Sequence, residues 1–320
     1  MDYKKFLPLI GIILLLYILA TMDLSGIAQI FLSLNPLFVF ASLFTIFPVL
    51  LLVNVQWQLL LKKQHINVRF FSSFKNIFIG FFYGFITPAG IGSYLRAIYL
   101  KKESNAPIPK CVSNIVTLST IDILTLLLWG AIATLFVSRR YPYLLIAIIL
   151  IFCFFLFLLV FFLRKRTSYF LFSRIIKTRV FQVLQKTIDD PLESFYEDLP
   201  RFRDLLLPAI LSFCGWFFFY AEFYVISRFF SVDVPFWSVI FIYAIANVIA
   251  TIPISIYGLG TREATLLSLF SLYPVLPVTV VSLSLYWFVI TMLLASIIGA
   301  IITLLEHKKE KTHRLNTAVS

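Results

Sequence analysis

Charged residues are scarce in this sequence, at 13% of 320 residues, while 61% are hydrophobic and the mean hydropathy is +0.97. A soluble domain has about 25% charged and about 45–50% apolar residues. A globular core cannot absorb this apolar excess, because a soluble domain still needs a polar surface. The composition therefore excludes a soluble enzyme, a DNA-binding domain and a disordered segment, and it predicts a polytopic membrane protein.

Residues and motifs that carry chemistry are also few. The three cysteines and three histidines share no ligand spacing, which argues against a disulfide framework and a metal site. The sequence has no Gly-x-x-x-x-Gly-Lys loop, no His-Glu-x-x-His and no Gly-x-Ser-x-Gly. No pair of acids is spaced for acid–base chemistry in one place. We therefore expect no catalytic residues, no cofactor and no metal, and we expect that the protein is not an enzyme.

Long apolar runs, by contrast, are plentiful. A membrane-spanning helix needs about 20 apolar residues, so each such run predicts one span of an all-α fold. Six runs qualify, at residues 6–22, 36–61, 111–137, 141–163, 205–230 and 277–304. The first lacks a clean signal-peptidase site at its end, so we expect it to be a retained helix.

The net charge is +12, which in a soluble protein would suggest nucleic acid as a partner. Here the basic residues flank apolar runs, so they predict membrane orientation and contact with anionic lipids instead. We expect a multi-pass protein of the cell membrane. The positive-inside rule places both termini, the loop 164–204 and the basic tail 306–320 in the cytoplasm. Arg139 and Arg140 conflict with this topology, because it places them outside.

Two further apolar regions are interrupted by a proline followed by two glycines. The interruptions are Pro88 with Gly90 and Gly92 in residues 70–100, and Pro253 with Gly258 and Gly260 in residues 235–276. Charge on the flanking segments predicts that the first region enters from the cytoplasm and the second from outside. Two oppositely oriented re-entrant hairpins indicate an inverted repeat, the common architecture of secondary transporters.

A short polar sequence follows each Gly-x-Gly. Ser93 and Thr261 are placed where a helix N-cap is expected. The helices that follow would direct free N–H groups at the break, and Arg96 and Arg262 would add positive charge. This pattern predicts a binding site for an anion such as a lipid phosphate. The alternative is that the glycines only permit a turn and the arginines reach the headgroups.

Two acidic residues complete the candidate site. Asp122 is about eleven residues into its helix, close to the membrane midplane, where an ionisable side chain suggests function. It could be a counter-charge for Arg96 or Arg262, which we favour, or a proton-accepting site. Glu263 follows Arg262 and favours the helix N-terminus.

The loop 164–204 mixes nine basic with six acidic residues, and its apolar residues recur at near-helical spacing. This pattern predicts an amphipathic helix on the inner leaflet. An anchoring connector is the favoured interpretation, and a regulatory or docking role is the alternative.

The two breaks and the acidic residue between them resemble the flippase-like family named for the transmembrane region of lysylphosphatidylglycerol synthetases. The resemblance covers roughly residues 5–305, and its matching positions are Pro88, Gly92, Arg96, Asp122, Pro253, Gly258, Gly260 and Glu263. It implies a membrane protein that handles lipids. Two departures stand out: Leu118-Ser119 replaces an expected Glu-Arg pair, and the sequence ends at Ser320 without the soluble aminoacyl-transferring domain. We therefore expect this chain not to make lysyl-lipid.

These observations favour a lipid flippase that moves an anionic, aminoacylated or glycosylated lipid between leaflets. One alternative is a secondary transporter of a soluble anion, which predicts a sealed midplane pocket. Another is a non-catalytic partner of a membrane-bound transferase, which would dock through the loop 164–204. The sequence leaves the lipid, the direction, the coupling ion and the oligomeric state open.

Overall fold

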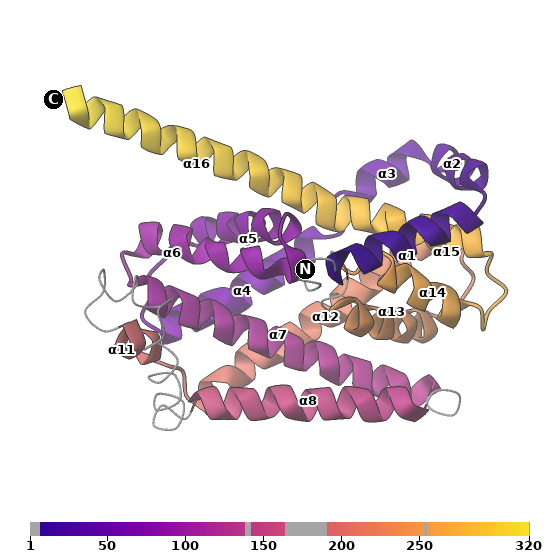
Figure 1. Cartoon of the computed structure of the whole chain (residues 1–320), viewed down its shortest axis with the longest axis horizontal. Coiled ribbons are helices and arrows are strands. Elements are labelled where there is room, and N and C mark those ends of the chain that lie inside the picture. The colour runs from indigo at the N-terminus through magenta and orange to yellow at the C-terminus, as the bar shows by residue number, and fades with distance from the viewer. Residues whose placement is uncertain (1–6, 138–141, 164–190, 253–254, 256, 320) are drawn as a thin grey trace. The chain divides into compact units, whose positions relative to one another are not determined.

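The computed structural model describes residues 7–137, 142–163, 191–252, 255 and 257–319. These residues are almost all helical, and no strand occurs among them (Figure 1). Apolar segments of this length fold as helices because lipid offers no partner for an unpaired backbone group. The all-α membrane fold expected from the sequence is thus confirmed.

The first apolar run forms α1 (Leu7–Thr21), and a second helix, α2 (Leu24–Ser33), follows it directly. The apolar parts of these two helices meet at an angle of 87°. Asp23 makes the corner, because its carboxylate accepts a hydrogen bond from the Ser25 N–H at 3.0 Å and caps α2. Most of the segment between the first two expected spans, residues 23–35, is therefore helix.

The next helices carry the first break. They are α3 (Pro36–Ser42), α4 (Phe47–Lys63), α5 (Phe70–Phe85), a 3₁₀ segment at Pro88–Leu95, and α6 (Arg96–Ser104). A turn at residues 43–46 separates α3 from α4, and the two helices together make up the candidate span Pro36–Lys63 expected at 36–61. Helix α5, the 3₁₀ segment and α6 have the helix–break–helix form expected for residues 70–100.

The middle of the chain forms long helices close to the expected limits. They are α7 (Ile108–Val137), α8 (Pro142–Leu163), the short α11 (Pro191–Tyr196), a 3₁₀ turn at Phe202–Leu205, and α12 (Leu206–Phe229). Residues 164–190, which carry most of the expected amphipathic segment, are outside the described part of the chain.

The last third carries the second break. Its helices are α13 (Phe236–Ala250), α14 (Thr261–Phe270), α15 (Pro277–Phe288), a π turn at Val289–Leu293, and α16 (Leu294–Val319). The expected basic tail 306–320 continues α16 as far as Val319.

Four helical segments are long and apolar enough to cross a membrane: Pro36–Lys63, Ile108–Phe136, Phe202–Phe229 and Pro277–Lys308. The bent pair formed by α1 and α2 would make a fifth, while Ile146–Phe161 and Phe236–Ala250 are shorter apolar helices. These figures concern the described residues alone, and the count of six spans stays a prediction.

The chain divides into two compact units that do not coincide with its two halves. Unit 1 comprises residues 1–47, 74–96 and 222–320, and unit 2 comprises residues 48–73 and 97–221. Within unit 1, α14 packs against α1, α13 and α15; within unit 2, α7 packs against α8 and α11. Both breaks belong to unit 1.

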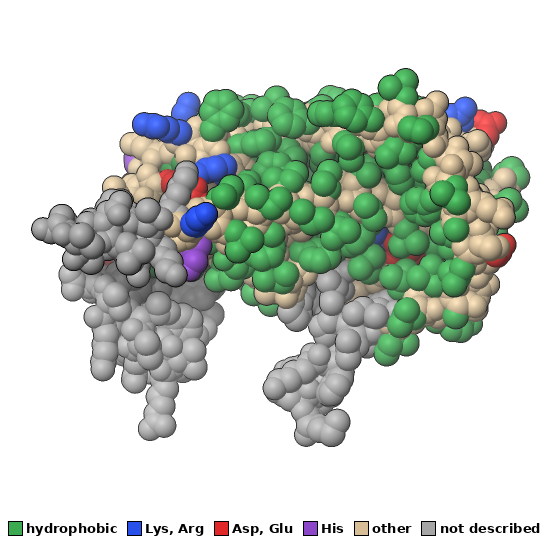
Figure 2. Space-filling view, turned by 90° about the horizontal axis from the view of Figure 1, so that it is seen from above, with side chains coloured by type: hydrophobic (Ala, Val, Ile, Leu, Met, Phe, Trp, Pro, Cys, Tyr) green, Lys and Arg blue, Asp and Glu red, His purple; other side chains and the backbone are tan. Residues whose placement is uncertain are grey.

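The surface is apolar where a soluble protein would be polar. The face in Figure 2 is covered mainly by hydrophobic side chains, and Leu32, Phe71 and Tyr143 are each more than 80% exposed. Large contiguous apolar surfaces mark contact with another apolar phase, here the lipid chains.

Candidate functional site

The first break is bonded to the C-terminal end of α5 through Thr87. The Thr87 hydroxyl donates to the Tyr83 carbonyl at 2.8 Å and accepts the Gly92 N–H at 2.7 Å. A Cβ at position 92 would collide with the Tyr83 carbonyl oxygen, so only glycine allows this close approach. Gly90 is in the left-handed region at φ 68°. This local fold delivers Arg96 to the start of α6.

Ser93 does not have the capping role expected from the sequence. It is inside the 3₁₀ segment Pro88–Leu95, whose N-cap position is Thr87, and α6 begins only at Arg96. The physical reason is the bond between Thr87 and Gly92, which coils the break into 3₁₀ turns that continue past the second glycine.

The second break ends in a cap made by glycine and glutamate. Gly260 is the N-cap of α14 with φ 85°, and its N–H donates to Glu263 Oε2 at 2.6 Å. Thr261 is therefore the first helical residue and not the cap, and its hydroxyl donates to the Gly258 carbonyl at 3.1 Å. Gly258, at φ 76°, packs so closely on Ala250 that a Cβ would collide with it. Pro253 is outside the described residues.

Arg262 and Glu263 form a buried, fully compensated ion pair. Their exposed fractions are 2% and 0%, and the Arg262 Nη2–Glu263 Oε1 distance is 3.1 Å. Ser284 on α15 donates to the same oxygen at 2.6 Å, and the guanidinium lies 5.2 Å from the Trp287 ring centroid. The anion at the N-terminus of α14 is thus Glu263 itself, and it also neutralises Arg262.

The two breaks meet on one face of α5. Gly80 and Gly84 are one helical turn apart, so they share that face. The aliphatic part of Arg96 packs on Gly80, while the Tyr257 hydroxyl contacts Gly84, which also adjoins Ser93. The Tyr257 hydroxyl is 3.4 Å from the Phe81 carbonyl.

Sequence reasoning missed the part played by α5. The available signal was the small-x-x-x-small spacing of Gly80 and Gly84, which allows close approach of another segment in membrane proteins. Tyr257 was missed because its role depends on a contact with Phe81, 176 residues away.

Asp122 belongs to unit 2, whereas Arg96 and Arg262 belong to unit 1. Its Oδ1 accepts hydrogen bonds from Gln56 Nε2 at 2.9 Å and Ser212 Oγ at 2.7 Å. These donors come from α4 and α12, so Asp122 ties α7 to two neighbouring helices. The carboxylate that pairs with Arg262 is Glu263, and a role of Asp122 as counter-charge to Arg96 or as a proton site stays a prediction.

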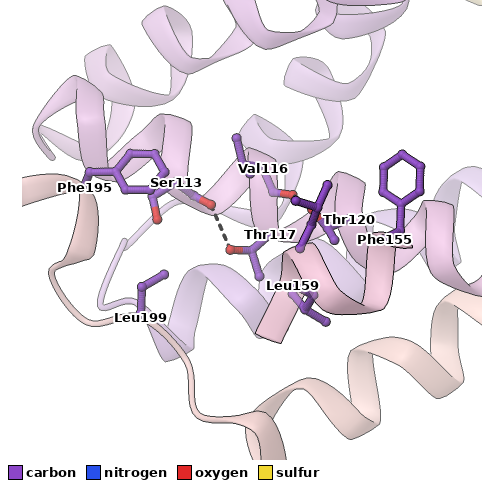
Figure 3. A pocket seen from close by; sticks show the side chains of 9 residues that line it. Ser113, Val116, Thr117, Thr120, Phe155, Leu159, Phe195 and Leu199 are labelled. Carbon is purple, nitrogen blue, oxygen red and sulfur yellow. Dashed lines mark hydrogen bonds between the residues drawn. The ribbon is translucent and has the colours of Figure 1, made fainter. Parts of the chain in front are cut away.

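Unit 2 also contains a cavity of about 90 Å³ between α7, α8 and α11 (Figure 3). Its polar wall is the α7 face with Ser113, Thr117 and Thr120, and its apolar wall includes Phe155 and Leu159. Its lining residues include hydroxyl groups but no charged side chain, so the cavity offers no cation for a lipid phosphate, whereas the breaks have Arg96 beside them.

Metal ligands do not converge anywhere in the described part of the chain: no group of three His, Cys, Asp or Glu side chains is placed to hold an ion. The comparison with curated individual proteins gave no match. The family model described as the lysylphosphatidylglycerol synthase TM region matches residues 7–299. That match covers most of the chain, includes both breaks and Asp122, and agrees with the resemblance noted in the sequence, so the protein belongs to the family of the lysylphosphatidylglycerol synthase transmembrane region.

Proposed function

We propose that this protein is a translocator that moves an anionic lipid between the leaflets of the membrane and makes no covalent change to it. The observation that carries the proposal is the meeting of the two breaks on the Gly80–Gly84 face of α5, with Arg96 beside them. The family supports a link with lipid modification or translocation.

Arg96 is the better of the two arginines for binding a headgroup phosphate. It is half-buried, so its charge is partly removed from solvent without being sealed. Arg262 already has Glu263 as its anion and is almost completely buried. A phosphate would bind at Arg96 first, and Arg262 would join only if its pair with Glu263 opened.

The apolar surface supports a lipid as cargo over a soluble anion. An acyl chain can stay in the bilayer beside exposed side chains such as Leu32 and Phe71 while only the headgroup enters the protein. The sequence contains no nucleotide-binding loop, so the energy would come from an ion gradient or from downhill lipid flow.

Native mass spectrometry of the purified protein tests this proposal. We expect an anionic lipid to co-purify with the wild type and to be lost from Arg96→Ala. Arg228→Ala is the matched control, because Arg228 is an exposed arginine of unit 1 paired with Asp233. Equal lipid binding by the wild type and Arg96→Ala would contradict the proposal.

Arg262 needs a different variant, because removing it alone would leave Glu263 as an unpaired buried anion. The neutral double variant Arg262→Met/Glu263→Gln avoids that defect. If Arg262 joins in binding, this variant should hold the lipid less tightly than the wild type. Translocation itself is measured in vesicles with a fluorescent anionic lipid and a membrane-impermeant quencher.

A further inference from the structure

Glu222 on α12 is a buried carboxyl group that the proposed site does not use. It is 5% exposed and lies about 10 Å from the C-terminal end of the helix, at 1.5 Å per residue. Its Oε1 is 2.7 Å from the Thr45 hydroxyl, in the turn between α3 and α4. Its Oε2 is buried and has no hydrogen-bond partner among the described residues.

Among the described residues of unit 1, the helices that pack against the Glu222 part of α12 carry no cation. Phe38 of α3 stacks on Phe229, and Tyr243 of α13 stacks on Phe223, so α3 and α13 pack against this part of α12. Trp287 of α15 also contacts Phe223. Helices α3, α13 and α15 and the turn 43–46 contain no Asp, Glu, Lys, Arg or His.

The other titratable and charged groups near this part of α12 are four tyrosines and two arginines that are already paired. The tyrosines are Tyr220 and Tyr224 on α12, Tyr243 on α13 and Tyr286 on α15. The cations are Arg228, which is paired with Asp233, and Arg262, which contacts Trp287 and is paired with Glu263. An ionised Glu222 would therefore be a buried charge without a partner of opposite sign, which is a costly state.

The hydrogen bonds of Thr45 point to the same protonation state. Its Oγ is 2.7 Å from the Ser42 carbonyl oxygen and 2.7 Å from Glu222 Oε1, yet a hydroxyl has only one hydrogen to donate. With Glu222 ionised, both neighbours are acceptors and compete for that hydrogen. With Glu222 protonated, its O–H donates to Thr45 Oγ, and the Thr45 O–H donates to the Ser42 carbonyl. Each of the two hydroxyl groups then donates to a single acceptor, and the competition for the Thr45 hydrogen is removed.

Glu263 in the same unit shows what a carboxylate held in its charged form looks like. It accepts hydrogen bonds from Arg262, Ser284 and the Gly260 N–H, so its negative charge is neutralised and its oxygens are satisfied. For Glu222, the Thr45 hydroxyl is the one hydrogen-bond partner among the described residues. The two buried glutamates are therefore in opposite electrostatic environments.

We propose that Glu222 is a proton-binding site: it is a neutral acid in this conformation at neutral pH, and it exchanges that proton with water during lipid translocation. Binding forms an O–H bond on the carboxylate with a proton taken from hydronium, and release returns the proton to water. The coupling part of this inference rests on the proposed function, whereas the binding of the proton does not.

Infrared spectroscopy of the purified protein tests the proton site without any transport. At neutral pH exposed carboxyl groups are ionised. We therefore expect the wild type to show a carbonyl-stretch band of a protonated carboxylic acid that shifts in D₂O. The band should be lost in Glu222→Gln and kept in Glu306→Gln, the matched control, whose carboxylate is paired with Lys75.

A second variant covers the case in which Glu222→Gln does not fold. Thr45→Val keeps Glu222 but removes its hydrogen-bond partner, so the band should move to higher frequency. Identical bands in the wild type and Glu222→Gln, or no band in the wild type and no change in Thr45→Val, would overturn the proton site.

Vesicle transport tests the coupling separately. An imposed pH gradient should change the lipid translocation rate of the wild type severalfold and leave that of Glu222→Gln unchanged. A response of both proteins to the gradient, or a sodium-driven response that Glu222→Gln abolishes, would contradict proton coupling at Glu222. Absence of lipid movement in the wild type with the infrared band present would reject the translocator function and leave the proton site standing.

Discussion

Arg262 and Glu263 are adjacent, oppositely charged and almost completely buried, so each depends on the other for neutralisation. Replacing one partner of such a pair leaves an uncompensated buried charge, which costs about 3–5 kcal/mol. We expect Glu263→Gln and Arg262→Met each to lower the free energy of unfolding by that order. The double variant should recover part of the loss, and denaturant unfolding in detergent measures all three.

An exposed pair provides the control for that prediction. Lys63 and Asp204 are 2.7 Å apart, but Lys63 is more than half exposed. Exposed pairs contribute about 0–1 kcal/mol, so Asp204→Asn should change stability by no more than that. Equal effects of Asp204→Asn and Glu263→Gln would show that the burial of the Arg262–Glu263 pair has no energetic consequence.

Gly92 is the residue on which the first break depends most directly. A methyl group there would collide with the Tyr83 carbonyl oxygen, a backbone atom that cannot move away by a side-chain rotation. Such overpacking costs about 1–3 kcal/mol, so we expect Gly92→Ala to lower the midpoint of thermal unfolding. Gly215→Ala is the control: it is in α12 with open space around its Cβ and should stabilise the helix by up to about 1 kcal/mol. A Gly92→Ala protein as stable as Gly215→Ala would contradict the assigned contact.

At the level of elements, an ion-pair cluster fastens the segment after α11 to the start of α7. Lys110 is 6% exposed, and its ammonium group lies 2.8 Å from Asp198 Oδ2 and 3.4 Å from Glu197 Oε1. The hydrogen bond from Lys110 lowers the pKa of Asp198 below its ordinary value of 3.8. The resulting stabilisation is full above that ordinary value and is lost as the pH falls through the lowered pKa.

Hydrogen exchange checks this pH dependence. We expect the backbone of residues 191–205 to lose protection when the pH falls below about 4, because protonated Asp198 no longer attracts Lys110. In Lys110→Met the segment should be less protected at neutral pH and show no further step on acidification. Acid-induced loss of protection that persists in Lys110→Met would assign the step to another group.

The elements around the breaks show how far the sequence could be interpreted. A proline with two glycines is enough to predict helix–break–helix, and both regions have that form. The helix starts were wrong at Ser93 and Thr261, because they depend on the reach of Thr87 to Gly92 and of Glu263 to Gly260. No local pattern gives the geometry of those bonds.

Hydrogen-bond partners that are far apart in the chain could likewise not be predicted from the sequence. Asp122 was predicted to lie near the membrane midplane, but its donor Gln56 is 66 residues away and Ser212 is 90 residues away. Glu222 and Thr45 are separated by 177 residues, so the sequence could not distinguish a paired carboxylate from an isolated one. Periodicity gives helices and breaks, whereas the protonation state of an acid depends on the assembled neighbours.

At the scale of the whole molecule, the compact units do not follow the predicted inverted repeat. Unit 1 gathers three separate stretches of chain and holds both breaks, while unit 2 holds Asp122. Under the proposed function, the groups that would bind the headgroup, Arg96 and Arg262, therefore lie in the same unit.

Membrane orientation is the remaining property of the whole chain, and the basic clusters predict it. In a cysteine-free background, Ser33→Cys should react with a membrane-impermeant thiol reagent in intact cells. A cytoplasmic N-terminus followed by the span 6–22 places α2, which contains Ser33, outside. Ser320→Cys should react only after permeabilisation, since the positive-inside rule places the tail in the cytoplasm.

Ser138→Cys is the decisive position, because Arg139 and Arg140 favour the cytoplasm while the charge clusters elsewhere place this loop outside. Labelling of Ser138→Cys from outside would uphold the topology; protection of that site together with labelling of Ser33→Cys would mean that α7 does not cross the membrane as assigned.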